Sequence, residues 1–400
     1  MKGRALTVGL HAEAVGHLWG DETHTNFSFL QRYLDAPDRS VLGQYFEDRL
    51  HKTTRRVRGM HPWFENLLPE HGGALRGRFA RALGIDPDDS FALLQALGAD
   101  LPGAVQVADD GDEPTDESRV VDEHPADVLA TTRFSLGGVQ LKFSMSGDPA
   151  RLTLGVLDDS RDQWILKIGS PAFPRLAENE HAIMSWCRAS GFDVPETRVV
   201  DVGVLPDLGA LPETPTGFLV RRYDRVPGGR VHQEDFAQVL SVRPGRKYDA
   251  IDAAGLVDLS GQILGRAGAE ETIRRLAVVV ATGNADAHLK NWSLVYLDRV
   301  QASWSPLYDQ VATIAYPSIE HRLALRIGHA KHMNEVRLDH LKWVGEHAGL
   351  EGGRVEELVR ETLTALAATF RQLDCMPDDL AAVLSAHWET VPMLSSYHLE

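Results

Sequence analysis

A dense run of polar residues, residues 284–291, follows a strongly apolar stretch that Gly283 can end. Within the run, Asp286 and Asn291 are separated by four residues, which is the spacing of the catalytic loop in protein kinases. At that spacing the aspartate can accept the proton of an attacking hydroxyl, and the asparagine amide oxygen can bind magnesium. Lys290 could neutralise charge on the phosphoryl group that moves. The alternative is a polar surface turn in which an asparagine caps a helix.

A second carboxylate, Asp309, comes eighteen residues after Asn291. Two short strand-like segments, residues 292–297 and 304–307, fit between them, so this carboxylate would follow a hairpin. A kinase places a magnesium ligand there, the aspartate of an Asp-Phe-Gly motif, although the Phe and the Gly are absent here. An isolated aspartate after a strand is more often a turn former. Its spacing from the first site makes Asp309 a candidate magnesium ligand.

A lysine, Lys167, lies within an apolar stretch, residues 164–168, that is typical of a strand. A buried ammonium needs a partner, because leaving it unpaired in a low-dielectric interior is costly. Glu180 lies near the apolar face of the helix that we expect at about residues 176–190, and it is our candidate partner. Such a pair holds the kinase lysine against the α and β phosphates of ATP. The alternative is a lysine at a strand edge whose ammonium reaches solvent.

Two adjacent glycines, Gly137 and Gly138, precede this strand within residues 135–142. Adjacent glycines permit a close approach of the backbone, whose N–H groups can then point at anionic oxygens. The segment has neither the G-x-G-x-x-G pattern nor a Walker A pattern, and an ordinary hairpin turn would also explain it. Its position before Lys167 is that of a loop covering phosphates.

The predicted secondary structure that positions these residues changes from one part of the chain to the next. Residues 1–108 mix short strands with helices, such as those predicted at 27–33 and 90–97. Residues 109–127 carry nine carboxylates and two prolines, which predicts a linker. Strand signals dominate residues 128–230, and residues 231–400 are largely helical. This order favours an α+β protein with a small β-rich lobe, a helical lobe and an additional N-terminal α/β module.

The amino-acid composition argues against several classes of function. A formal net charge of −16 argues against broad binding to nucleic acid, but not against a small basic patch or DNA reached through a partner. No stretch approaches the roughly 18 apolar residues of a membrane span, so we expect a cytoplasmic protein without a membrane partner. Two cysteines provide no disulfide framework. His321, His329 and His332 lie close together without a carboxylate at zinc-site spacing, which favours a surface or substrate-groove role.

Several strings resemble the motifs of HipA-family kinases, in that family's order. They are residues 135–142, 179–180, 222–225, 232–235, 286–291 and 308–309, and residues 59–69 resemble the family's N-terminal module. The resemblance covers nearly the whole chain. It implies a bilobed protein-kinase-like fold with an extra N-terminal module at residues 1–108, a linker at 109–127, a small lobe at 128–230 and a helical lobe at 231–400.

The same resemblance implies an ATP- and Mg²⁺-dependent protein serine/threonine kinase that is the toxin of a type II toxin–antitoxin pair. Its substrate would be a cellular protein, such as an aminoacyl-tRNA synthetase. Its partner would be a small, HipB-like DNA-binding antitoxin, through which it would reach DNA. Autophosphorylation would fall on Ser135, where about two added negative charges would weaken the binding of ATP.

The resemblance also assigns roles to single residues. Catalysis is assigned to Asp286 and Lys290, and magnesium binding to Asn291 and Asp309. The family's adenine-contacting hinge maps onto Arg221, Arg222 and Tyr223. Arg221 stands where some family members have an acidic residue, a change that backbone contacts to adenine would survive. The complete nucleotide-binding set is Gly137, Gly138, Val139, Gln140, Leu141, Lys142, Lys167, Arg221, Arg222, Tyr223, His288, Asn291 and Tyr308.

Two other functions remain open from the sequence. The first is a small-molecule kinase similar to the aminoglycoside or choline phosphotransferases, which have a comparable site with a loose glycine loop. The N-terminal module and the serine in the glycine loop favour a protein substrate instead. The second is a degenerate kinase that acts as a scaffold or corepressor with a DNA-binding partner.

Overall fold

The computed structural model describes residues 4–20, 23–50, 55–109, 141–146, 153–154, 163–169, 172–204 and 215–399. The chain forms two compact units. Unit 1 contains residues 1–171, 200–245 and 293–301, and unit 2 contains residues 172–199, 246–292 and 302–400. Residues 135–140 of the predicted glycine loop and residues 110–127 of the predicted linker lie outside the described residues.

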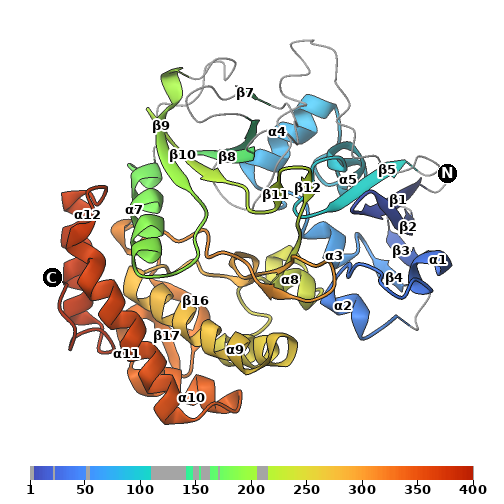
Figure 1. Ribbon diagram of the computed structural model, residues 1–400. Helices are drawn as coiled ribbons and strands as arrows, with labels where there is room; N and C mark the ends of the chain where they lie inside the picture. Colours follow the sequence, from blue (N-terminus) through green and yellow to red (C-terminus); the bar gives the residue numbers. More distant parts are fainter. Residues whose placement is uncertain are drawn as a thin grey trace. The chain divides into compact units, whose positions relative to one another are not determined.

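The first part of unit 1 is an antiparallel sheet with the strand order β4-β3-β2-β1-β5. Helix α5 packs beside β5 (Figure 1), and Val8, Leu18, Phe27 and Leu94 are completely buried in the core. The strands are β1 (Arg4–Leu10), β2 (Glu13–Gly20), β3 (His24–Phe29), β4 (Arg55–Arg58) and β5 (Val105–Asp109). The helices are α1 (Gln31–Leu34), α2 (Gln44–Glu47), α3 (Pro62–Glu65), α4 (Ala74–Leu83) and α5 (Ser90–Leu97).

The structure confirms the helix predicted at residues 90–97, whereas the helix predicted at 27–33 is wrong. Strand β3 continues to Phe29, and α1 is a single turn that begins at Gln31. The burial of Thr25, Phe27 and Phe29 alternates with half-exposed neighbours, which is the period of a strand with one buried face. Pairing with β2 and β4 therefore outweighs the short helix-like spacing.

The second sheet of unit 1 contains the strands β7-β6-β8-β10 in that order. Strand β8 lies between β6 and β10, so every residue of β8 is buried. Trp164, Leu166 and Ile168 lie on one face of β8 and pack with Leu219 in the apolar core, and the strand predicted at residues 164–168 is confirmed. These strands are β6 (Leu141–Ser146), β7 (Thr153–Leu154), β8 (Gln163–Ile168) and β10 (Thr216–Arg221), and a further strand, β9 (Thr197–Asp201), has residues in both units.

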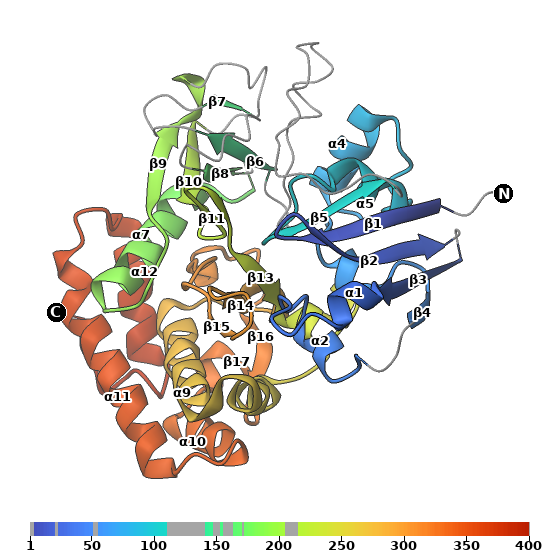
Figure 2. The same cartoon turned by 45° about the vertical axis from the view of Figure 1, so that its right-hand side comes forward.

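The described residues of unit 1 also contain two short pairs of strands and one short α-helix. β11 (Arg225–Val226) and β12 (Gly229–Arg230) form a tight hairpin. β13 (His232–Asp235) pairs antiparallel with β14 (Ser293–Tyr296), and Figure 2 shows these two strands side by side. The next helix, α8 (Phe236–Val239), begins at a capping box in which Asp235 and Gln238 each accept from the other's backbone N–H.

Unit 2 is mainly helical, and α9, α10 and α11 pack against one another (Figure 1). Trp186 of α7 donates to the Leu366 carbonyl of α11 at 2.9 Å. The helices are α7 (Leu176–Ala189), α9 (Ala253–Thr282), α10 (Leu338–His347), α11 (Gly352–Thr369) and α12 (Asp378–Thr390), and the strands are β15 (Ser303–Trp304), β16 (Arg322–Ile327) and β17 (Ala330–His332). Helix α7 confirms the helix predicted at residues 176–190.

Helix α9 ends at Gly283, as its sequence predicted. This residue has φ +66°, and a Cβ here would lie 2.4 Å from the Ile314 side chain. Both the left-handed backbone and the close contact require glycine. Among the described residues, no helix has the length and apolar character needed to cross a membrane.

Candidate active site

The polar loop after α9 is held against the segment that contains Asp309. The Asn284 side-chain amide donates to the Asp309 carbonyl at 3.2 Å. The Thr313 hydroxyl accepts from the Ala285 N–H at 2.7 Å and donates to the Gly283 carbonyl at 3.0 Å. These bonds bring together two polar segments that are well separated in the sequence.

The side chains of Asn291 and Asp309 meet at this junction. Asn291 is the last residue of the short 3₁₀ helix η3 (Leu289–Asn291). Its Nδ2 donates to Asp309 Oδ2 at 3.2 Å. The structure therefore places the two predicted magnesium ligands side by side.

The other side-chain atom of Asn291 is available to a ligand. Oδ1 is buried and has no hydrogen-bond partner among the described residues. A buried acceptor without a partner is costly unless water or an ion satisfies it. Amide and carboxylate oxygens are ligands that Mg²⁺ prefers, and protein sites often supply only one or two of them. Asn291 and Asp309 thus fit a magnesium ion, which when bound would neutralise charge on phosphate oxygens.

Asp309 has an unusual backbone conformation, with φ +56°. Aspartate tolerates the left-handed region better than most residues, but the conformation still has a cost and must be held by its surroundings. The neighbouring Tyr308 supplies one such restraint, because its hydroxyl donates to the Lys290 carbonyl at 2.8 Å. A second restraint comes from Gln310, whose Nε2 donates to the Tyr308 carbonyl at 3.0 Å.

Tyr308 is almost buried, and this bond joins it to the backbone of the loop that carries Asp286. Its hydroxyl therefore has a positioning role that the sequence did not reveal. The nucleotide contact assigned to Tyr308 stays a prediction.

Asn179 of α7 also holds this segment. Its Oδ1 accepts from the Ala312 N–H at 2.9 Å, and its Nδ2 donates to the Ala312 carbonyl at 3.1 Å. Asn179 is buried, and its side-chain amide binds both the N–H and the carbonyl of one residue, so that it clamps the backbone at Ala312. Its role was not predicted, although it stands next to Glu180 in a string that the sequence had marked.

Asp286 is exposed, unlike most of the loop around it. Its Oδ1 accepts a hydrogen bond from the Tyr248 hydroxyl at 2.8 Å. Its backbone N–H donates to Asn284 Oδ1 at 3.2 Å, which fixes the turn. An accessible carboxylate on a fixed loop can receive a proton from a substrate hydroxyl.

His288 and Lys290, in the same loop, are both buried. Burial, followed by the nearby positive charge of Lys247, lowers the pKa of His288 well below its ordinary value, although Asp309 opposes the shift. His288 is therefore neutral at physiological pH. Its predicted nucleotide contact would be made by an uncharged ring.

Lys167 and Glu180 belong to different compact units. Lys167 is buried on β8, and its Nζ lies 5.4 Å from the centre of the Phe218 ring. Glu180 is buried on α7. Their ion pair stays a prediction.

Ser135, Gly137, Gly138, Val139 and Gln140 lie outside the described residues, so their roles in phosphate binding and autophosphorylation stay predictions.

The next two residues, Leu141 and Lys142, begin β6. The backbone of Leu141 pairs with Ile168, and that of Lys142 pairs with Lys167. The end of the predicted glycine loop is thus the neighbour of the strand that carries the predicted phosphate-binding lysine.

The predicted hinge begins at Arg221, the last residue of β10. The next residue, Arg222, donates its backbone N–H to the Gln163 carbonyl at 2.8 Å. Tyr223 donates its hydroxyl to Gln233 Oε1. These contacts fix the hinge backbone within unit 1.

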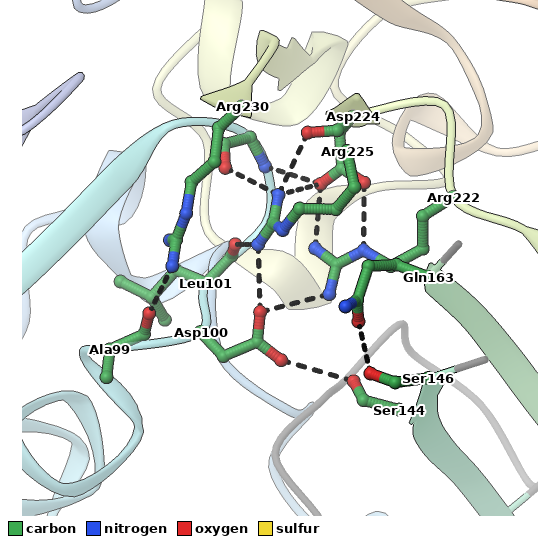
Figure 3. Close-up of polar contacts among 11 residues, drawn as sticks. Ala99, Asp100, Leu101, Ser144, Ser146, Gln163, Arg222, Asp224, Arg225 and Arg230 are labelled. Carbon is green, nitrogen blue, oxygen red and sulfur yellow. Dashed lines mark hydrogen bonds and ion pairs between the residues drawn. The ribbon is translucent and has the colours of Figure 1, made fainter. Parts of the chain in front are cut away.

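The side chain of Arg222 is completely buried in a charged cluster (Figure 3). Its guanidinium donates to both Asp224 oxygens at 2.9 and 2.8 Å and to Asp100 Oδ1 at 3.0 Å. Arg225 donates to the same Asp100 oxygen at 2.8 Å. Any nucleotide contact of Arg222 must therefore involve its backbone.

The cluster keeps its carboxylates ionised. Burial alone would raise the pKa of Asp224, but the guanidiniums of Arg222 and Arg225 hold that pKa well below its ordinary value. The second oxygen of Asp100 accepts from the Ser144 hydroxyl of β6 at 3.2 Å (Figure 3). The cluster thus joins the hinge to the strand that follows the predicted glycine loop.

Two family models match this chain. The HipA N-terminal domain matches residues 6–108, and the HipA-like C-terminal domain matches residues 134–370. A protein of Sinorhizobium fredii named "Putative kinase Y4dM" is 37% identical over 382 residues, which cover 91% of each chain.

The chain belongs to the HipA family.

Other relatives of this HipA-family protein are more distant. The "Serine/threonine-protein kinase toxin HipA" of Shewanella oneidensis is 25% identical over 366 residues, which cover 81% of this chain and 80% of the toxin. A solved complex of Shewanella oneidensis HipA with HipB and operator DNA contains a chain that matches with a TM-score of 0.73. That match has 19% identity and covers 97% of this chain and 96% of the other. The HipA-family chain therefore has the same mixed α+β fold.

Proposed function

We propose that this HipA-family protein is an ATP- and Mg²⁺-dependent protein serine/threonine kinase. The observation that carries the proposal is the contact between Asn291 and Asp309, with the amide oxygen of Asn291 buried and without a hydrogen-bond partner among the described residues. The exposed carboxylate of Asp286 is on the same loop as Asn291. Phosphoryl transfer needs side chains that bind the metal and an accessible carboxylate that accepts the proton of the attacking hydroxyl.

Asp286 and two lysines have roles of their own in the proposed reaction. Asp286 accepts the proton of a serine or threonine hydroxyl, whose oxygen forms a bond to the γ-phosphorus of ATP. The bond from that phosphorus to the bridging oxygen breaks, and ADP leaves. Lys290 and Lys167 balance the negative charge of the phosphates, so that catalysis comes mainly from positioning and charge neutralisation.

The proposed fold is that of a bilobed kinase. Residues 128–230, which include the sheet β7-β6-β8-β10, would be the small lobe, and residues 231–400 would be the helical large lobe. Residues 1–108 would be the additional N-terminal module. The separate matches of the two HipA domains support the distinction between this module and the rest of the chain.

We further propose that the kinase is the toxin of a toxin–antitoxin pair and acts in the cytoplasm on a cellular protein, with an aminoacyl-tRNA synthetase as one candidate. The similarity to the Shewanella oneidensis toxin, and to its complex with HipB and operator DNA, supports a small DNA-binding antitoxin as the partner. The net charge of −16 favours DNA contact through that partner rather than through this chain.

Mass spectrometry of the intact protein, with and without ATP and Mg²⁺, tests the kinase proposal. We expect the wild type to gain phosphate, and peptide mapping to place it on Ser135. Asp286→Asn should reduce the incorporation at least a hundredfold. Asp298→Asn, at an exposed aspartate on a turn of unit 1, is the matched control and should behave as wild type.

Other results would contradict the proposal. Full phosphorylation of Asp286→Asn would remove that residue from the catalytic role. Transfer of phosphate to an amino alcohol or an aminoglycoside, with none to protein, would identify a small-molecule kinase. A wild type without a nucleotide-dependent thermal shift would instead support a noncatalytic scaffold or corepressor.

A further inference from the structure

A turn that precedes α9 touches the loop of the proposed catalytic aspartate. The backbone N–H groups of Asp249 and Ala250 both donate to the Arg246 carbonyl, which closes the turn around residues 247 and 248. The Leu289 N–H donates to the Lys247 carbonyl at 3.1 Å. This bond anchors the turn to the short helix η3, three residues after Asp286.

The side chain of Tyr248 extends from this turn to the carboxylate. Its hydroxyl donates to Asp286 Oδ1 at 2.8 Å. The tyrosine keeps 47% of its surface exposed. Core packing therefore does not explain its place, since a large aromatic side chain is usually more deeply buried.

Two further contacts restrain the ring of Tyr248. The ring of His288 meets it nearly at a right angle, with the centres 5.2 Å apart. The Lys247 ammonium lies 5.1 Å from the centre of the ring, within reach of a cation–π attraction. The ring is therefore held on two sides, and its hydroxyl points at Asp286.

We propose that Tyr248 is a positioning residue for Asp286 in phosphoryl transfer, an inference that rests on the kinase function proposed above. A carboxylate turns readily about its last bond, so an exposed aspartate presents its oxygens in many directions. The hydrogen bond from the Tyr248 hydroxyl to Oδ1 restrains this rotation and keeps the carboxylate in one orientation for accepting the proton of the substrate hydroxyl. Tyr248 keeps its own proton throughout, and the substrate oxygen bonds to phosphorus as ADP departs.

This arrangement predicts an effect on turnover rather than on nucleotide binding. Tyr248→Phe removes the hydroxyl and keeps the ring contacts to His288 and Lys247. We expect kcat to fall roughly tenfold, the size associated with a hydrogen bond to a charged group. The KM for ATP and the thermal shift caused by ATP and Mg²⁺ should stay as in wild type, because Tyr248 is not placed on the nucleotide.

The experiment compares steady-state kinetics of the full-length wild type, Tyr248→Phe, Tyr248→Ala and Tyr397→Phe. Tyr397 is the matched control, since it lies in the same unit and beyond α12. Similar losses in kcat for Phe and Ala support the role of the hydroxyl. Wild-type kcat in Tyr248→Phe, with loss only in Tyr248→Ala, would show that the ring merely packs and would overturn the proposal.

A fall in ATP affinity equal to the fall in kcat would also overturn it, because that result would indicate general disruption of the site. The result that would contradict the kinase function differs from the result that would contradict the role of Tyr248. A wild type that transfers no phosphate contradicts the proposed function itself, whereas an active wild type matched by Tyr248→Phe contradicts only the role of the tyrosine.

Discussion

Asp100 and Arg222 form an ion pair at 3.0 Å in which both side chains are completely buried. Asp100 lies in the segment that matches the HipA N-terminal domain, and Arg222 lies in the segment that matches the HipA-like C-terminal domain. The pair therefore fastens one family domain to the predicted hinge of the other within a single compact unit. Arg225 strengthens the junction by donating to the same carboxylate.

Removing the carboxylate should destabilise this junction strongly. In Asp100→Ala, Arg222 and Arg225 would lose a shared partner while remaining buried, and breaking such a pair costs about 3–5 kcal/mol. Chemical denaturation should show this loss. Asp48→Ala, at an exposed aspartate of the same unit, should change the stability by less than about 0.5 kcal/mol. Equal stability of the two variants would refute the structural role of the cluster.

Magnesium binding should depend on both Asn291 and Asp309. We expect Asn291→Ala and Asp309→Asn each to weaken the binding of Mg²⁺ in the presence of ATP by about tenfold or more, because the first loses an oxygen ligand and the second loses the negative charge of its carboxylate. Isothermal calorimetry measures the affinity, and Asn334→Ala, at an exposed asparagine, serves as the control. Unchanged affinity in both variants would show that this pair does not hold the metal.

The clamp of Asn179 on Ala312 should be sensitive to a single substitution. Asn179→Ala leaves a buried N–H and a buried carbonyl without their partner, and we expect a loss of about 2–3 kcal/mol in the free energy of unfolding. The variant should also weaken Mg²⁺ binding, since Ala312 is three residues from Asp309. A variant that loses stability but binds Mg²⁺ as wild type does would separate the clamp from the metal site.

His232 should make the stability depend on pH. Burial lowers its pKa from an ordinary 6.5 to about 3, although the bond between its Nε2 and the Leu42 carbonyl acts in the opposite direction. Below pH 6.5 the unfolded chain takes up a proton that the folded protein excludes. The stability contribution is therefore complete above pH 6.5 and is lost as the pH falls towards 3, by up to about 1.4 kcal/mol for each pH unit.

The measurement for His232 is the unfolding free energy of wild type and His232→Gln between pH 4 and pH 8. Glutamine can keep a donor to the Leu42 carbonyl but does not titrate, so the variant should lose less stability on acidification. Parallel pH curves for the two proteins would contradict the prediction.

Several local features around the candidate site were predictable because the residues that form each of them lie close together in the sequence. The spacing of Asp286 and Asn291, the end of α9 at Gly283 and the alternation of Trp164, Leu166 and Ile168 all follow from local geometry. Helix periods, strand periods and turn residues act over a few positions, so they can be read without knowing the fold. The helix predicted at residues 27–33 failed because pairing between strands outweighed a short local pattern.

Other relationships required the tertiary structure. Tyr248 meets Asp286, Asn179 clamps Ala312, and Asp100 pairs with Arg222 across 38, 133 and 122 positions of the chain, respectively. No local spacing specifies such partners. Folding brings them together because each buried polar group must find a hydrogen-bond partner, and the choice of partner depends on how whole elements pack. The sequence alone determined the family and the types of chemical group at the site, whereas only the folded chain decided which groups hold the others in place.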